Sequence, residues 1–127
     1  MPTPSASTNA AFYRWDNVPR EDVSPQLARR LISGERLMMA QVELKRGCLV
    51  PAHAHVHEQI TYVVEGCLRL NVGDDLGESY DLRAGDVLHI PSNVRHSGEA
   101  QEDTRVIDLF SPPREDWLQG TDAYLRR

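Results

Sequence analysis

The sequence lacks the features that mark secreted, membrane-spanning or nucleic-acid-binding chains. It has two cysteines in 127 residues, Cys48 and Cys67, too few for a disulfide framework. No apolar run approaches the ~20 residues that span a bilayer, and the first residues, MPTPSASTNAAFYRW, show neither the basic start nor the apolar stretch of a secretory signal. We therefore expect a cytoplasmic protein with reduced thiols and no membrane partner.

Basic clusters are also missing. The net charge is -5, the sequence pI is about 5.5, and no run of lysine or arginine is longer than a pair. This composition argues against nucleic acid as a partner. Small acidic molecules remain possible ligands if a local arginine meets them.

What is present fits one globular domain. Charged residues make up 26% of the chain and hydrophobic residues 40%, and 127 residues can bury a core without metal or disulfide support. Residues 1–11 carry almost nothing to bury and read as a flexible N-terminal arm. We expect the domain to occupy residues 12–127.

From residue 27 onward, short apolar runs alternate with turn residues. They are LARRLIS (27–33), RLMMAQVEL (36–44), CLVPAHAH (48–55), QITYVVE (59–65), CLRLNV (67–72), SYDL (79–82), VLHI (87–90), VRHSGE (94–99) and TRVIDLF (104–110). Eight or nine such strands, each followed by a turn signal, predict an all-β antiparallel sandwich or barrel. Only residues 114–119 (REDWLQ) depart from this rhythm, and they predict a short C-terminal helix.

The stretch HAHVHEQ (53–59) holds three of the five histidines. His53 and His55 are two residues apart, so on a strand both side chains point to the same face. Imidazole is the commonest protein metal ligand, so the pattern raises a metal site. Two alternatives stay open: an exposed His-rich loop, and a metal-free barrel whose histidines are hydrogen-bonded core residues.

Two longer patterns resemble the paired motifs of the cupin superfamily. The first joins Gly47, His53, His55, Gln59 and Gly66, and the second joins Gly85, Pro91, Asn93 and His96. The resemblance implies a single-domain cupin double-stranded β-helix (jelly-roll) barrel. It also implies one divalent metal ion bound by His53, His55, Gln59 and His96.

The match departs from the common cupin pattern in two places. Gln59 stands where most members have Glu, and Asn93 where many have Gly, although Asn tolerates the left-handed turn conformation. Three nitrogens and one amide oxygen leave two open octahedral positions and suit Mn, Fe, Co, Ni or Zn. An amide leaves the ion its full positive charge, which favours Lewis acidity.

For other residues near the motifs, the sequence leaves two positions open. His57 and Glu58 fall in a predicted turn between two strands, either supporting the ligands or exposed. His89 lies on a strand that is apolar on both faces, so it either lines the pocket or meets a partner. Alternation places Leu68 inward and Cys67 outward.

The last strand adds an acid. Asp108 shares one strand face with Val106 and Phe110, and an Asp pointing into a barrel can be tuned for proton transfer. The alternative places Asp108 in solvent, with Ile107 and Leu109 inside. Arg114, after Pro112 and Pro113, either returns over the barrel mouth to bind a carboxylate or is a solvated residue at the helix start.

The set HxHxHEQxxYVxxG, GDVxxIPxNVxH and DxFSPPREDxL is similar to small pectin-degradation cupins of the uronate-linearising type. That resemblance implies ring opening of 4,5-unsaturated uronate monosaccharides to the linear 5-keto-4-deoxyuronate. It also implies roles around the substrate for Asp108, Phe110 and Arg114. Two rival functions remain, a metal-dependent cupin dioxygenase and a non-catalytic sugar or metabolite sensor.

We also expect a homodimer. Ile60, Tyr62 and Val64 would form an apolar outer face on a small barrel with an open sheet edge.

Overall fold

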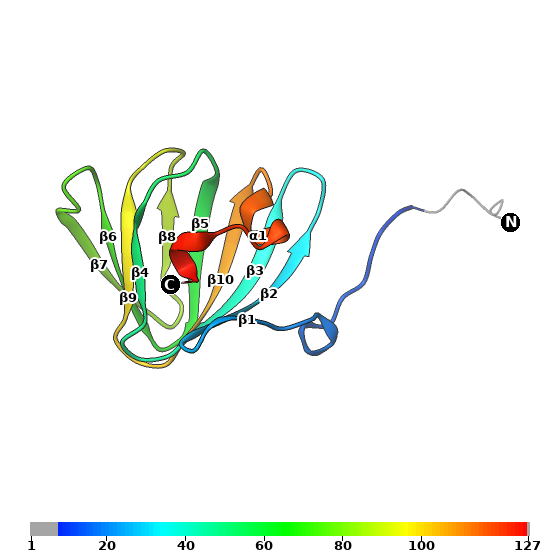
Figure 1. The fold of residues 1–127 in the computed structure, drawn as a ribbon, viewed down its shortest axis with the longest axis horizontal. Coiled ribbons are helices and arrows are strands. Elements are labelled where there is room, and N and C mark those ends of the chain that lie inside the picture. Colours follow the sequence, from blue (N-terminus) through cyan, green and yellow to red (C-terminus); the bar gives the residue numbers. More distant parts are fainter. Residues whose placement is uncertain (1–7, 127) are drawn as a thin grey trace, which may run out of the picture.

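The computed structural model describes residues 8–126 and contains ten strands, one α-helix and two 3-10 helices (Figure 1). The strands are β1 (Glu21–Ser24), β2 (Leu27–Ser33), β3 (Met38–Leu44), β4 (Leu49–His53), β5 (Glu58–Glu65), β6 (Cys67–Val72), β7 (Glu78–Arg83), β8 (Val87–Ile90), β9 (His96–Ala100) and β10 (Thr104–Ser111). The helices are η1 (Trp15–Asn17), α1 (Glu115–Gln119) and η2 (Ala123–Leu125).

All strands pair antiparallel in two sheets. The larger sheet has the order β1-β2-β3-β10-β5-β8, and the smaller has β4-β9-β6-β7. The sheets face each other in Figure 1 and enclose one apolar core. The predicted all-β barrel and the short C-terminal helix are therefore confirmed. All nine predicted runs contain a strand, and the one strand not predicted is β1, whose sequence EDVS is mostly polar.

Strand alternation builds the core as the sequence predicts. On β5 the buried residues Gln59, Thr61 and Val63 alternate with the more exposed Ile60 and Tyr62. Such alternation is typical of a sheet with one face packed and the other wet. The inward faces of β5 and its neighbour β10 therefore line the same interior.

One predicted face was wrong. Cys67 and Leu68 are both buried, although alternation placed Cys67 outside. Cys67 begins β6, and its backbone N–H and C=O both hydrogen-bond the hydroxyl of Thr104 at 3.1 Å. The start of β10 at Thr104 therefore packs against Cys67, where strand parity alone predicts solvent.

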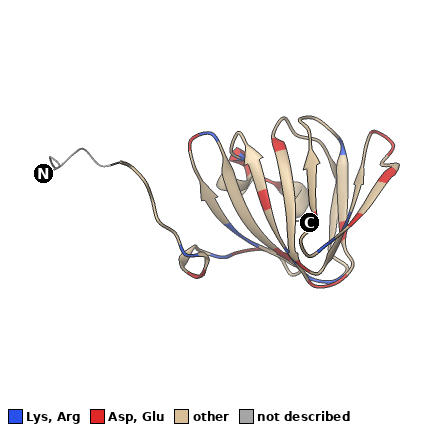
Figure 2. Cartoon of the chain, turned by 180° about the vertical axis from the view of Figure 1, so that it is seen from behind, with Lys and Arg blue, Asp and Glu red and all other residues tan. Residues whose placement is uncertain are grey.

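The described part of the N-terminal segment lacks regular structure, and charged residues of both signs are spread over the domain. Most of the predicted arm at residues 1–11 lies outside the described residues, and residues 8–14 carry no helix or strand. Basic and acidic residues are intermixed along the strands and loops in Figure 2. Among residues 8–126, helices are too short or too polar to cross a bilayer.

Candidate metal centre

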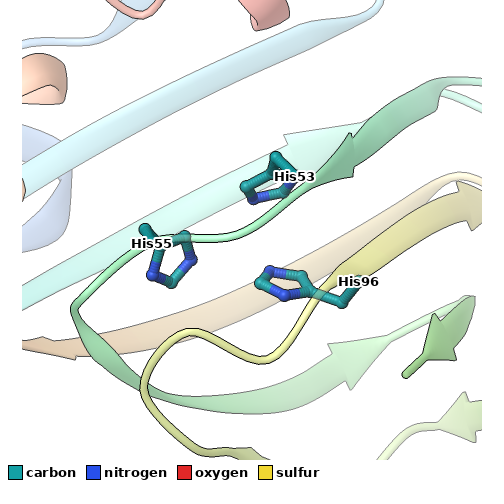
Figure 3. A group of neighbouring side chains, drawn as sticks. All are labelled: His53, His55 and His96. Atoms are coloured by element: carbon teal, nitrogen blue, oxygen red, sulfur yellow. The ribbon is translucent and has the colours of Figure 1, made fainter. Parts of the chain in front are cut away.

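Three histidines meet at one end of the barrel. His53 ends β4 and lies opposite His96, the first residue of β9. His55 follows in the loop, and its ring centroid is 5.4 Å from that of His53 and 5.1 Å from that of His96. Figure 3 shows the three rings turned toward one another. One nitrogen from each ring lies within 4.8 Å of the other two, so the three can hold one metal ion.

The strand that carries the motif is shorter than predicted. It ends at His53, and His55 lies in the connection to β5. The loop is held in place by a hydrogen bond from the backbone N–H of Asn93 to the carbonyl of His55, at 2.8 Å. Asn93 adopts φ 65°, the left-handed conformation expected for it. The turn that contains Asn93 therefore helps to position His55.

Backbone carbonyls fix the orientation of each ring. The Nδ1 atoms of His53, His55 and His96 lie 2.8, 3.0 and 2.9 Å from the carbonyls of Pro51, His57 and Val94. Since a carbonyl only accepts, each Nδ1 carries the proton, which leaves the lone pair on Nε2. Metal-binding histidines commonly use their second nitrogen in this way.

The rings are also neutral at physiological pH. Burial, together with the charges of nearby His96 and Arg114, lowers the pKa of His53 to about 4 and that of His55 to about 3. Burial likewise lowers the pKa of His96. Neutral imidazole is the form that binds metal, so protons do not compete for these nitrogens at pH 7.

Gln59 brings an oxygen to the same place. Its side-chain Oε1 lies 3.1 Å from Nε2 of His55, and its Nε2 donates to the hydroxyl of Thr61 at 2.9 Å. The one proton of neutral His55 is already directed at the His57 carbonyl. Two lone pairs therefore face each other between His55 and Gln59, a contact that a shared cation makes favourable. The donor set thus fits a divalent metal ion.

Asp108 points into the barrel, as the inward alternative predicted. It is 8% exposed and accepts a hydrogen bond from the Thr61 hydroxyl at 2.6 Å. Burial raises its pKa to about 6, although the bond from Thr61 and the charge of Arg114 act in the opposite direction. A carboxyl with a pKa near 6 can both take and return a proton near neutral pH.

Arg114 is buried, so the solvated alternative was wrong. It is 2% exposed and binds the Asp116 carboxylate through Nε and Nη2 at 3.0 and 2.9 Å. Its guanidinium lies over the rings of both Phe110 and Trp117, 5.1 and 4.9 Å from their centroids. Within residues 8–126, its third nitrogen, Nη1, makes no hydrogen bond and is free to meet a ligand.

The C-terminal segment covers the histidines. The ring of Tyr124 lies 4.7 Å from that of His53, and its hydroxyl accepts hydrogen bonds from Arg114 and Trp117 at 2.7 and 3.2 Å. A cavity of about 60 Å³ remains beneath it, lined by His53, Gln59, His96, Asp108, Phe110, Arg114, Trp117 and Tyr124 among others. Four residues of this site were not predicted from the sequence: Thr61, Asp116, Trp117 and Tyr124.

The structure shows the positions of three residues for which the sequence left two alternatives. His89 is on the outer face of β8, where its Nε2 lies 2.6 Å from the carboxylate of Glu58, and both side chains are more than half exposed. His57 packs edge-on against His55, with ring centroids 5.3 Å apart. His57 therefore supports a candidate ligand, and neither Glu58 nor His89 lines the cavity.

A larger groove of about 770 Å³ lies at the opposite end of the strands. Its walls include Arg20, Glu43, Lys45, Glu65 and Arg105. These charged side chains are far along the strands from the histidines, so this groove is separate from the candidate metal centre.

Comparison with known proteins agrees with this geometry. The family model described as "Cupin domain" matches residues 40–110, which include all four candidate ligands. The structure of KdgF from Halomonas sp. superimposes with a TM-score of 0.78 at 35% sequence identity, covering 84% of this chain and 99% of that one.

Two curated enzymes are also similar. Oxalate decarboxylase OxdC of Bacillus subtilis is 31% identical over 77 residues, or 59% of this chain. The 3-hydroxyanthranilate 3,4-dioxygenase of Brucella anthropi is 24% identical over 106 residues, or 81% of this chain. The chain spans 20% of the length of the first and 58% of the second.

Proposed function

This chain belongs to the cupin family, and we propose that it is a metal-dependent enzyme that linearises 4,5-unsaturated uronate monosaccharides. The observation that carries this proposal is the placement of Asp108, a buried carboxyl with a pKa raised to about 6, in the wall of the histidine cavity. The similarity to KdgF and the uronate-linearising motifs support the same reaction.

We assign the metal ligands to His53, His55, Gln59 and His96. A divalent ion bound there supplies Lewis acidity toward an oxygen of the substrate. Because Gln59 is neutral, this set neutralises none of the ion's charge. Manganese, iron, cobalt, nickel and zinc all suit it.

The reaction is an isomerisation in which Asp108 accepts a proton from a substrate hydroxyl and returns one to C4. The unsaturated ring is a hemiacetal at C1 and an enol ether at C5. Opening breaks the C1–O5 bond, forms the C1 aldehyde as the O1 hydroxyl loses its proton, and leaves an enol at C5. The enol becomes the 5-ketone when C4 gains a proton and the C5 hydroxyl loses one. Atoms and electrons balance without an oxidant or an organic cofactor.

Arg114 and Phe110 orient the substrate in this proposal. The free Nη1 of Arg114 donates a hydrogen bond to the uronate carboxylate, and Phe110 forms an apolar wall beside that carboxylate. A cavity of about 60 Å³ is far below the ~300–1,000 Å³ of usual ligand pockets. Trp117 and Tyr124 therefore have to move outward as the sugar enters.

The test follows unsaturated galacturonate by proton NMR with metal-loaded protein, with and without oxygen. We expect the linear 5-keto-4-deoxyuronate to form at the same rate in both cases, and the spontaneous rate when the metal is removed. A product that forms only with oxygen would establish the rival dioxygenase, which the similarity to the Brucella enzyme favours. Tight binding without turnover would establish a sensor.

Assembly and location extend the proposal. Ile60, Tyr62 and Val64 are 38–42% exposed on the outer face of β5, and we expect a second copy of this chain to cover them. Light scattering at micromolar concentration should give a homodimer, and Tyr62→Glu should shift it toward the monomer. A monomeric parent protein would contradict this expectation.

Both cysteines are free thiols, which supports the expected cytoplasmic location.

A further inference from the structure

Thr61 links a candidate metal ligand to the candidate proton carrier. Its hydroxyl accepts a hydrogen bond from Nε2 of Gln59 at 2.9 Å and donates one to Oδ1 of Asp108 at 2.6 Å. Thr61 is 1% exposed. It pairs with Asp108 across β5 and β10, so the sheet register holds the two side chains together.

The direction of these hydrogen bonds is fixed at the Asp108 end. A carboxylate has no hydrogen to donate, so the Thr61 hydroxyl must donate to it. The oxygen of Thr61 can then only accept from Gln59, which turns the amide nitrogen of Gln59 toward Thr61. The other end of the amide, the oxygen Oε1, is left facing Nε2 of His55.

Apart from Thr61, the Asp108 carboxylate also attracts the amide NH₂ group of Gln59, and Thr61 holds that carboxylate in place. The cross-strand neighbours of Gln59 are Phe110 on β10 and Ile90 on β8, and both are buried, apolar side chains. An amide whose ends differ only in one oxygen and one nitrogen fits the same space either way round. Without the hydroxyl, the NH₂ group could face the histidines, and an NH₂ group has no lone pair for a metal.

We propose that Thr61 is a positioning residue that selects the oxygen of Gln59 for the metal centre. The wider cupin pattern has Glu at this position, and a carboxylate presents an oxygen whichever way it turns. An amide ligand, in contrast, requires a neighbour that fixes its orientation. This inference rests on the metal ligands and needs no turnover of a uronate, so it can fail or succeed independently of the proposed reaction.

The experiment titrates Mn²⁺ into metal-stripped protein at pH 8 and measures free Mn²⁺ by electron paramagnetic resonance. Thr61→Val keeps the shape and removes the hydroxyl, and we expect the dissociation constant to rise about 10- to 100-fold, the usual effect of losing a supporting hydrogen bond. Thr61→Ser restores the hydroxyl and should restore affinity. Thr104→Val, which removes a buried hydroxyl at the far end of β10, should leave affinity unchanged.

A double-mutant cycle separates orientation from general damage. With Gln59→Glu both ends of the side chain are oxygens, so adding Thr61→Val should change Mn²⁺ affinity by no more than about twofold. An equal loss in both backgrounds would overturn the inference, as would parental affinity in Thr61→Val. A parent protein that binds no divalent ion would overturn it together with the ligand assignment.

Discussion

His96→Ala should abolish the bound metal ion and, with it, turnover of unsaturated galacturonate. His96 is 3% exposed, and its ring centroid lies 4.3 Å from that of His53. Alanine removes one of only four protein ligands, and no other described side chain is placed to replace it. We expect metal content by mass spectrometry to fall from about one ion per chain to near zero, and His53→Ala to behave in the same way.

The outer histidine supplies the matched control. His89 lies on the outside of β8 against Glu58, so His89→Ala removes the same side chain without reaching the centre. This variant should keep full metal content. Full occupancy in His96→Ala would contradict the ligand assignment, and loss in both variants would indicate a general effect of histidine removal on folding.

Asp108→Asn should slow the catalysed reaction by ~100-fold or more, the usual contribution of a general acid or base. Asparagine keeps the shape of the side chain and can still accept the hydrogen bond from Thr61, but it cannot carry a proton. We therefore expect metal content and substrate binding to be retained while kcat falls. The measurement is the initial rate of loss of the substrate's conjugated absorbance.

The pH dependence identifies the group. Asp108 must be ionised to accept a proton, so the parental rate should fall as the pH drops through about 6, or lower with the cation bound. The residual rate of Asp108→Asn should lack this fall. Asp81→Asn, on the exposed edge strand β7, should leave both rate and profile unchanged. An Asp108→Asn variant as active as the parent would remove this residue from the mechanism.

The barrel could be predicted because most strands correspond to a short apolar run in the sequence, bounded by turn residues. Parity within the runs placed Ile60, Tyr62 and Val64 on the outer face of β5, and the structure agrees. For β10, the sequence offered two equally apolar faces. The neighbouring strands determine which face of β10 turns inward. β10 lies between β3 and β5, and Asp108 pairs with Ala40 and Thr61 on the inner face.

The C-terminal cover could not be predicted, because it depends on contacts between segments far apart in sequence. The buried carboxylate of Asp122 binds Arg29 of β2 at 2.7 Å, and the Arg29 guanidinium lies 4.5 Å from the ring centroid of Trp117. These contacts hold residues 115–126 against the barrel and bring Tyr124 to His53. Thr61, by contrast, was within reach of parity, because it lies two residues after Gln59.

The most direct test of the proposed function is the rate at which metal-loaded parent protein consumes unsaturated galacturonate, compared with the spontaneous rate in the same buffer. We expect rapid loss of the conjugated absorbance, a return to the spontaneous rate after metal removal, and recovery when a divalent ion is restored. If the metal-loaded protein leaves the sugar to react at its spontaneous rate, the proposed uronate linearisation is wrong.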